Sequence, residues 1–263
     1  MNDILRTLPI WAVFVAITAL LLASAEAGNR LGIFARKREG DHKPADIGTL
    51  LGSVLGLLAL LLGFTFAMSA SRYEARRELV VKEANAIGTA YLRSRLLPEP
   101  QRTELGNLFR RYIDAKLEIA VSLSDAGKTT KLLDEMEQEQ NRMWAAGGEV
   151  AATGQNPVLT SIFLQALNDV IDVHGERVAA FRARVPTSIF MVGLVVALLA
   201  MLLTGFSAGL GDNRNVVATT LACLLVALVM MLIVDLHRPD TGTITISQQS
   251  MVDLRDWLGR QGP

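Results

Sequence analysis

The sequence predicts an all-α integral membrane protein with four transmembrane helices and a helical extramembrane domain inserted between the second and the third. Two observations predict this fold class: four long apolar segments without internal charges, and a polar middle section that separates them into two hairpins. Each segment can cross a hydrocarbon core of about 30 Å as a helix. A backbone in lipid has to satisfy its own hydrogen bonds, which favours helices. The segments lie near residues 8–25, 47–68, 188–210 and 216–234.

The composition of the chain agrees with the lipid bilayer as its main partner. Hydrophobic residues make up 51% of the 263 residues, charged residues make up 20%, and the formal net charge is zero. The polar middle section is itself balanced in charge. The sequence therefore disfavours a nucleic-acid partner, which would require an excess of basic residues.

Residues 1–70 form the first predicted hairpin, with a loop at 29–46 between its two spans. Ala23-Ser24-Ala25 resembles a signal-peptidase site after a short apolar run. However, Asp3 weakens the positive charge that normally precedes such a run, and the apolar stretch is long enough to span. The first helix is therefore expected to be retained.

The second span is expected to continue far beyond the membrane as one helix. No proline and no turn cluster occurs between Ile47 and Leu97. Pro98-Glu99-Pro100 ends the run, because proline removes a backbone donor and disfavours helix in the residue before it.

Residues 71–186 are predicted to form a helical, cytosolic domain, because apolar residues recur there at helical spacing. Residues 187–236 form the second transmembrane hairpin, and residues 237–263 form a C-terminal tail. The individual elements are expected as helices at 103–124, 128–153 and 157–185, a turn at 125–127, a short strand at 243–246 and a terminal helix at 250–260.

Basic residues near the membrane ends predict which side the large domain faces. Nine Lys or Arg residues lie on the side of the large domain and six on the other side. Because such residues are enriched in cytoplasmic loops, this count favours a cytoplasmic domain. The tight Arg36-Lys37-Arg38 cluster in the first loop favours the opposite orientation.

The sequence contains no pattern typical of a catalytic, cofactor or metal site. His42, His174 and His237 lie far apart, and no HExxH, GxSxG or P-loop motif occurs. Cys223, the only cysteine, lies inside the last apolar segment and is expected to be a small packing residue. We therefore expect no enzyme.

Glu26 is a charge at the membrane edge, at the end of the first span. A carboxylate in that position is costly unless it is hydrated or paired. Arg30, one helical turn later, can neutralise it. The alternative interpretation is a gating or cation-attracting group.

Glycines recur every four positions on two of the spans, and this spacing lets helix backbones approach closely in lipid. Gly48, Gly52 and Gly56 lie on the second span, and Gly205 and Gly209 lie on the third. The second helix is therefore expected to pack tightly, either with its own copies around an axis or against another span of the same chain.

Five residues on one drifting face of the second helix are candidates for lining a pore. A ring of such residues around an axis makes a narrow apolar constriction of the kind that gates ions by dewetting. The same stripe on a single helix is ordinary core, so the residues alone leave both interpretations open. The five residues are Gly56, Leu60, Phe64, Ala67 and Ser71.

Residues 62–76 resemble the second helix of bestrophins, because a Gly63-Phe64 pair precedes a Ser/Ala patch and then Ser71-Arg72-Tyr73-Glu74-Ala75-Arg76. The order of two spans, a helical domain, two spans and a tail is also similar. More closely, the chain resembles the bacterial bestrophin-like domain membrane proteins over nearly its full length. The further motifs that carry this resemblance are residues 26–32, 71–77, 83–89, 97–100 and 235–239.

The resemblance implies a pentameric anion channel, because bestrophins are pentamers whose second helix lines a hydrophobic neck on the five-fold axis. Carried over by position, the neck consists of Phe64, Leu60 and Gly56. Bestrophins usually have a bulky residue at the place of Gly56, and a glycine ring leaves a wider or differently packed pore. No aromatic-rich calcium clasp is evident, so calcium activation does not carry over.

We therefore expect a homo-oligomeric ion channel of the bacterial inner membrane, with the second helix lining the pore and ions as possible ligands. The alternative is a non-conducting membrane scaffold or sensor whose four-span base anchors a helical interaction domain. The observation that separates the two is whether the second helices surround a central passage.

Overall fold

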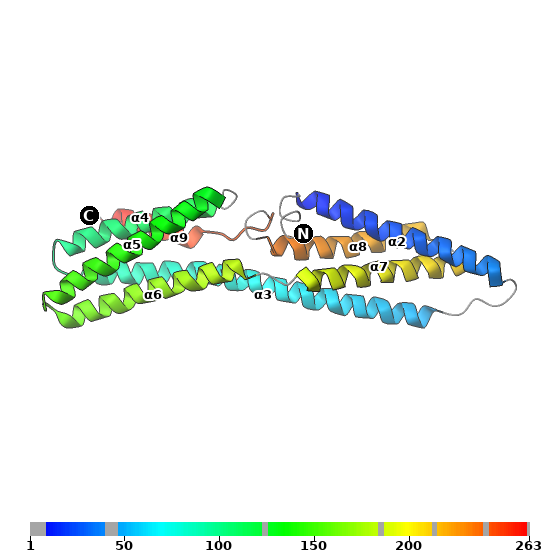
Figure 1. The fold of residues 1–263 in the computed structure, drawn as a ribbon, viewed down its shortest axis with the longest axis horizontal. Coiled ribbons are helices and arrows are strands. Elements are labelled where there is room, and N and C mark those ends of the chain that lie inside the picture. Colours follow the sequence, from blue (N-terminus) through cyan, green and yellow to red (C-terminus); the bar gives the residue numbers. More distant parts are fainter. Residues whose placement is uncertain are drawn as a thin grey trace. The chain divides into compact units, whose positions relative to one another are not determined.

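The structure, a computed structural model, describes residues 9–39, 47–122, 126–183, 187–211, 215–238 and 242–261. Every regular element within these ranges is an α-helix, which confirms the all-α fold class (Figure 1). Leu8, the predicted start of the first span, and His42 lie outside the described residues.

Four of the helices, namely α2, α3, α7 and α8, are long and apolar enough to cross a membrane, which confirms the four predicted candidates. α4, α5 and α6 lie between α3 and α7 in the sequence. The helices are α2 (Ile10–Glu39), α3 (Gly48–Ser94), α4 (Gln101–Ser122), α5 (Ala126–Ala152), α6 (Pro157–Arg182), α7 (Thr187–Leu210), α8 (Val216–Leu236) and α9 (Gln249–Arg260).

The chain divides into two compact units. The first consists of Met1–Ser71 and Arg184–Ile244, and the second consists of Arg72–Ala183 and Thr245–Pro263. α3 thus contributes its apolar first half to one unit and its polar second half to the other. The C-terminal tail is also shared, because α9 belongs to the second unit.

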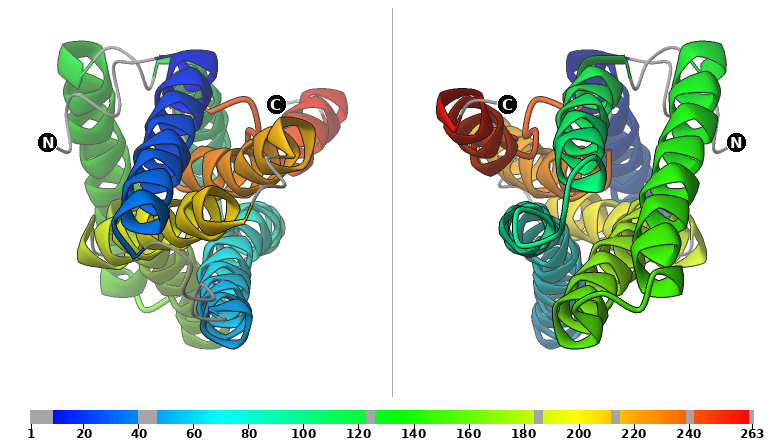
Figure 2. Two further views of the ribbon diagram at one scale, coloured as in Figure 1. Left: turned by 90° about the vertical axis from the view of Figure 1, so that its right-hand side faces the viewer. Right: turned by 90° about the vertical axis from the view of Figure 1, so that its left-hand side faces the viewer.

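The core of the first unit is formed by α2, α7 and α8. α2 lies beside both α7 and α8 (Figure 2). Leu21 of α2, Met201 of α7 and Met230 of α8 are buried in one apolar cluster. α3 joins this cluster through Leu58 and Leu62.

α2 is longer than the predicted first span, and the loop predicted at 29–46 is wrong for residues 29–39. The apolar run weakens near Ala25, but the helix continues to Glu39. No proline interrupts these residues, and three basic residues in the last turn favour the negative end of the helix dipole. The end of the apolar run is therefore not the end of the helix.

The second unit is a bundle of α4, α5, α6 and α9 with the second half of α3. α5 packs against α4 and α6, and α9 packs against α4. The largest fully buried side chains are aromatic, namely Phe109 and Tyr112 of α4 and Phe163 of α6. These residues belong to the apolar stripes that predict the helices.

Two local expectations are wrong. Ala126 and Gly127, predicted as part of a turn, belong to the first turn of α5. The strand predicted at 243–246 is absent, because these residues form bends and irregular backbone. The buried carboxylate of Asp235 accepts hydrogen bonds from the backbone N–H of Thr243 at 2.8 Å and of Ile244 at 3.1 Å. These donors therefore close a turn after α8 instead of pairing with a strand.

α3 confirms the expectation of one long helix. It runs without a break for 47 residues from Gly48 to Ser94, including the stretch between Ala70 and Leu79 where charged residues replace apolar ones (Figure 1). α4 begins at Gln101, directly after the Pro98-Glu99-Pro100 segment.

Candidate functional site

α3 has the least packed membrane-spanning segment of the four candidates. Only 6% of its most apolar 18-residue window is buried, whereas 22% to 28% of the corresponding windows is buried in α2, α7 and α8. Leu58 and Leu62 are its buried apolar residues in this span. Most of the apolar surface of the α3 span is thus exposed in the single chain.

The five candidate pore-lining residues all lie on this exposed surface. Phe64 and Leu60 expose 65% and 54% of their surface, which is high for large apolar side chains. They lie one turn apart and share a face, whereas Leu58 and Leu62 lie two positions from Leu60 and point to the other side of the helix. We call Gly56, Leu60, Phe64, Ala67 and Ser71 the open face of α3.

The glycines on α3 and α7 have different surroundings. A Cβ atom built on Gly205 would lie 1.8 Å from the carbonyl oxygen of Ala25, and one on Gly209 would lie 2.3 Å from that of Asn29. Both residues therefore allow the backbones of α7 and α2 to touch. In contrast, a Cβ atom on Gly52 or Gly56 meets nothing within 4 Å among the described residues, and Gly48 begins α3.

The partner glycines on α2 are Gly28 and Gly32, whose Cβ atoms would meet the α7 backbone at Leu202 and Phe206. Two glycine pairs with the same four-residue spacing thus face each other across α2 and α7. The packing argument from sequence considered only the apolar spans and missed Gly28 and Gly32, which lie just beyond the first of them.

Gly205→Ala is expected to destabilise the first unit, because its Cβ atom has no room against α2. Overpacking of this kind costs about 1–3 kcal/mol in free energy of unfolding, so the melting temperature in detergent should fall. Gly193→Ala is the matched control on α7, since a Cβ atom there meets none of the described residues within 4 Å. Equal losses in the two variants would contradict the close α2–α7 crossing.

Glu26 lies on α2 and forms an ion pair with Arg30 one turn later, with 2.9 Å between Arg30 Nε and Glu26 Oε1. Both side chains are more than one third exposed. The predicted neutralisation of Glu26 by Arg30 is therefore present in the structure. An exposed ion pair of this kind contributes little to stability.

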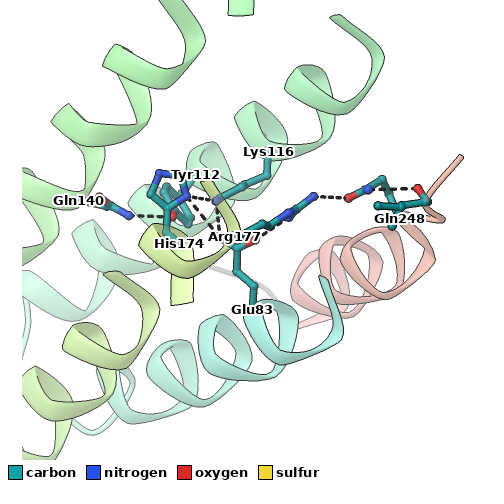
Figure 3. Close-up of polar contacts among 8 residues, drawn as sticks. Glu83, Tyr112, Lys116, Gln140, His174, Arg177 and Gln248 are labelled. Carbon is teal, nitrogen blue, oxygen red and sulfur yellow. Dashed lines mark hydrogen bonds and ion pairs between the residues drawn. The ribbon is translucent and has the colours of Figure 1, made fainter. Parts of the chain in front are cut away.

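A buried ionic cluster lies in the second unit and joins most of its helices (Figure 3). Its centre is Glu83 of α3, whose side chain is fully buried. Lys116 of α4 donates to Glu83 Oε1, and Arg177 of α6 donates to Oε2 at 2.5 Å. His174 of α6 lies beside them, with its Nδ1 atom 2.5 Å from Lys116 Nζ. We call Glu83, Lys116, His174 and Arg177 the ionic cluster.

Neutral side chains complete the surroundings of the ionic cluster. Lys116 Nζ lies 5.2 Å from the centre of the Tyr112 ring, a cation–π contact. Gln140 of α5 donates to the Tyr112 hydroxyl at 2.8 Å. Arg177 Nη2 donates to Gln248 Oε1 at 2.7 Å, which links the cluster to the segment before α9 (Figure 3).

The charges of the ionic cluster are perturbed by burial and by one another. Burial raises the pKa of Glu83, but His174, Lys116 and Arg177 outweigh it and hold the pKa at about 2. Burial lowers the pKa of Lys116 to about 8, although the charge of Glu83 opposes this. Burial and the nearby Glu83 raise the pKa of Tyr112 well above 10.0. Glu83 is thus ionised, and Lys116 pays a desolvation cost for its charge.

The sequence contained a signal for the ionic cluster that the motif search missed. Glu83 lies between Val80 and Ile87 on an apolar stripe, and Lys116 follows Tyr112 on another. A charged residue within the apolar stripe of a helix faces the core together with that stripe. A charge buried there is costly unless a residue of opposite charge or a hydrogen-bond partner compensates it. Among the described residues, no group of three His, Cys, Asp or Glu side chains could hold a metal ion.

Four apolar helices, a helical second unit and a long α3 that joins them define a multi-span helical membrane protein. The Bestrophin-like domain model matches residues 11–251, so the chain belongs to the Bestrophin-like domain family. No curated protein matches it.

Solved structures of similar fold agree with this family. One variant of a bacterial bestrophin homolog from Klebsiella pneumoniae is 17% identical, with a TM-score of 0.66, covering 97% of this chain and 99% of that chain. Another variant of it is 18% identical, with a TM-score of 0.63 and coverage of 92% and 99%. A structure described as a membrane protein is 19% identical, with a TM-score of 0.63 and coverage of 94% and 99%. At these identities the likeness shows the fold alone.

Proposed function

We propose that this protein is a homo-oligomeric, pentameric ion channel of the bacterial inner membrane, and that the open face of α3 lines its pore. The exposed apolar surface of the α3 span is the observation that carries the proposal. A membrane helix that packs against its own chain on one side only is covered on the other by lipid, by further copies or by a water-filled passage. Membership of the Bestrophin-like domain family, known for ion channels, favours copies around a passage.

The glycines of α3 support contact between copies. In the part of the chain that the structure describes, a Cβ atom on Gly52 or Gly56 meets nothing within 4 Å, yet glycine in a helix interior costs about 1 kcal/mol relative to alanine. A helix from another copy that approaches α3 closely at Gly52 and Gly56 would explain these glycines, since small residues mediate helix contacts in lipid.

Gly52→Leu is therefore expected to weaken assembly while leaving the isolated chain folded. The larger side chain fits within one chain but obstructs a close contact between copies. Size-exclusion chromatography with light scattering in detergent measures the size of the oligomer. Gly193→Leu serves as a control on another span, where a Cβ atom also has no described residue within 4 Å. An oligomer of unchanged size and thermal stability would contradict the proposal that the glycines of α3 mediate contact between copies.

The open face also supports a gate. Phe64 and Leu60 are large, apolar and one turn apart, so copies around an axis would form two stacked apolar rings that expel water. Gly56, one turn further, would widen the passage. The resemblance to bestrophins points to anions as the conducted ions, and the count of basic residues favours a cytoplasmic second unit.

Single-particle imaging of the purified protein, together with ion flux into liposomes, tests the proposal. We expect a closed ring of copies with α3 innermost, and flux of chloride above that of empty liposomes. A ring that passes potassium instead would change the ion class only. A particle without a central passage and without flux would favour the non-conducting scaffold.

A further inference from the structure

The last turns of α2 continue past the end of α7, against which α2 packs. A Cβ atom built on Gly32 would lie 2.9 Å from the Cα atom of Gly209, so these two residues lie at the same level. α7 ends one residue after Gly209, at Leu210, whereas α2 continues from Gly32 to Glu39. At 1.5 Å per residue, this extension of α2 is about 10 Å long.

The extension of α2 lies at the level of lipid headgroups. α7 carries no charged residue, and its 24 residues make a helix of about 36 Å, which is enough to cross a hydrocarbon core of about 30 Å. The end of α7 therefore marks the end of the hydrocarbon core, close to Gly32 of α2. The headgroup region beyond the core is roughly 5–8 Å thick, so the extension crosses it.

One side of the extension is first apolar and then, one turn later, cationic. Gly32 faces α7, and the side turned away from α7 carries Leu31 and Phe34, which expose 52% and 64% of their surface. Lys37 and Arg38 follow Phe34 by three and four positions, the spacing that places residues on the same side of a helix. Both side chains are exposed. We call Leu31, Phe34, Lys37 and Arg38 the outer face of α2.

The charge of this segment favours an anion. Residues 31–39 contain three basic residues and a single acidic residue, Glu39. The helix dipole explains why cations are favourable at this end of α2, but it gives no reason for a large apolar surface beside them. Leu31 and Phe34 need an apolar cover, and Lys37 and Arg38 need an anion one turn further along the helix.

We propose that the outer face of α2 is a binding site for an anionic phospholipid, whose acyl chains lie along Leu31 and Phe34 and whose phosphate is held by Lys37 and Arg38. Phe34 and Arg38 are about 6 Å apart along the helix axis. This is the step from the hydrocarbon core into the headgroup region. The order of apolar and cationic residues along α2 thus matches the order of acyl chains and phosphate in a lipid.

Native mass spectrometry of the full-length protein in an uncharged detergent tests the site by counting bound lipids. The probes are phosphatidylglycerol and phosphatidylcholine with the same acyl chains, and the tested variant combines Lys37→Gln with Arg38→Gln. Its affinity for phosphatidylglycerol at the outer face should fall about fivefold for each cation removed, or about 25-fold for the pair. The variant should therefore lose one bound phosphatidylglycerol per chain and keep its binding of phosphatidylcholine. An unchanged number of bound phosphatidylglycerol molecules would overturn the proposal.

The combination of Lys131→Gln with Arg142→Gln is the matched control. It removes two cations of α5 in the second unit, whose side chains are 78% and 59% exposed, and it changes the net charge by the same amount. This variant should bind phosphatidylglycerol as the wild type does. Equal losses of lipid in the two double variants would show that binding follows the net charge, which would overturn the proposal.

The melting temperature separates lipid binding from the effect of the helix dipole. Loss of Lys37 and Arg38 weakens the favourable dipole interaction of α2 with or without lipid. In contrast, a ligand that binds the folded protein raises the melting temperature only when it is present. Phosphatidylglycerol should therefore raise the melting temperature of the wild type more than that of the double variant. Equal increases would show that the two cations do not hold the lipid.

The wild type alone provides a test that does not depend on the folding of any variant. The increase in melting temperature with phosphatidylglycerol should shrink as the salt concentration rises, because salt screens exposed charges. Glycerol 3-phosphate, which has the phosphate but no acyl chains, should give no increase. An increase that is independent of salt, or an equal increase with glycerol 3-phosphate, would contradict an anionic lipid as the ligand.

The size of the oligomer tests the other possible occupant of the outer face, a neighbouring copy of the chain. Light scattering should give the same oligomer for the wild type and for the variant without Lys37 and Arg38. A smaller oligomer with unchanged lipid binding would assign the outer face to contact between copies and overturn the proposal. None of these measurements requires ion flux, so a protein that conducts nothing can still bind the lipid.

Discussion

Alanine at both Phe64 and Leu60 is expected to raise ion flux through the reconstituted protein, with each single variant giving a smaller increase. If copies of α3 surround an axis, these side chains form two apolar rings one turn apart. An ion that leaves water to cross them meets a desolvation barrier of several kcal/mol. Smaller side chains widen the rings and let water enter. Flux of chloride and of potassium into liposomes measures the effect.

Leu62→Ala is the matched control for these variants, because Leu62 lies between them in sequence but points into the apolar cluster of the first unit. Truncation of a buried leucine costs about 2–5 kcal/mol, so this variant should melt earlier and pass no additional ions. The Phe64 and Leu60 variants, exposed in the single chain, should keep most of their stability. A stable double variant that passes neither ion would favour the scaffold.

The large elements of the fold were predictable because each depends on one strong local signal. Long apolar runs identify the four candidate spans, and the absence of proline from Ile47 to Leu97 predicts the unbroken α3. The aromatic residues of α4 and α6 occupy the core positions that their spacing indicates. Each of these signals lies within a single segment, so it can be recognised without knowing which other segment of the chain packs against it.

The errors occur where a tertiary contact decides the local structure. α2 continues past Ala25 as a helix whose Gly28 and Gly32 pack on α7. The residues after α8 form a turn because Asp235 accepts their N–H groups. In both places the hydropathy of the segment is compatible with the structure and with the wrong prediction.

The ionic cluster was hidden for a similar reason. Its members lie on three helices that are distant in sequence, and Glu83 and Lys116 have exposed residues of the same charge nearby, such as Glu78 and Arg111. Burial becomes visible only when Glu83, Lys116 and Arg177 are placed on their apolar stripes. Which cation pairs with Glu83 is set by the packing of α3, α4 and α6, and the sequence carries no separate signal for it.

Glu83→Gln is expected to destabilise the second unit strongly. The variant keeps the shape of the side chain but removes the only carboxylate of the ionic cluster, so the buried Lys116 and the partly buried Arg177 lose their acceptor and counter-charge. Breaking a buried ion pair from one side costs about 3–5 kcal/mol in free energy of unfolding. Thermal or urea unfolding at pH 7, followed by tryptophan fluorescence, to which Trp144 of α5 and Trp257 of α9 contribute from the second unit, measures the loss.

Lys116→Met should cost much less, although it removes a member of the same pair. It leaves Glu83 with Arg177, a neutral pair, and it replaces a cation whose pKa burial already lowers to about 8. Comparing the two variants therefore shows whether the stability of the ionic cluster depends mainly on the carboxylate of Glu83 or equally on each ion pair. Similar losses of unfolding free energy in the two variants would show that the second cation of the ionic cluster is not dispensable.

The pH dependence of unfolding should separate the two variants further. The pKa of Glu83 is lowered from 4.5 to about 2, so its contribution to stability is complete above pH 4.5 and is lost as the pH falls toward 2. Glu83→Gln should lack this part of the acid transition.

The pKa of Lys116 is lowered from 10.5 to about 8, so between these pH values the unfolded chain binds a proton that the folded protein does not. The free energy of unfolding of the wild type therefore rises with pH through that window. Lys116→Met should lose that gain, and a variant that retained it would show that another group is responsible.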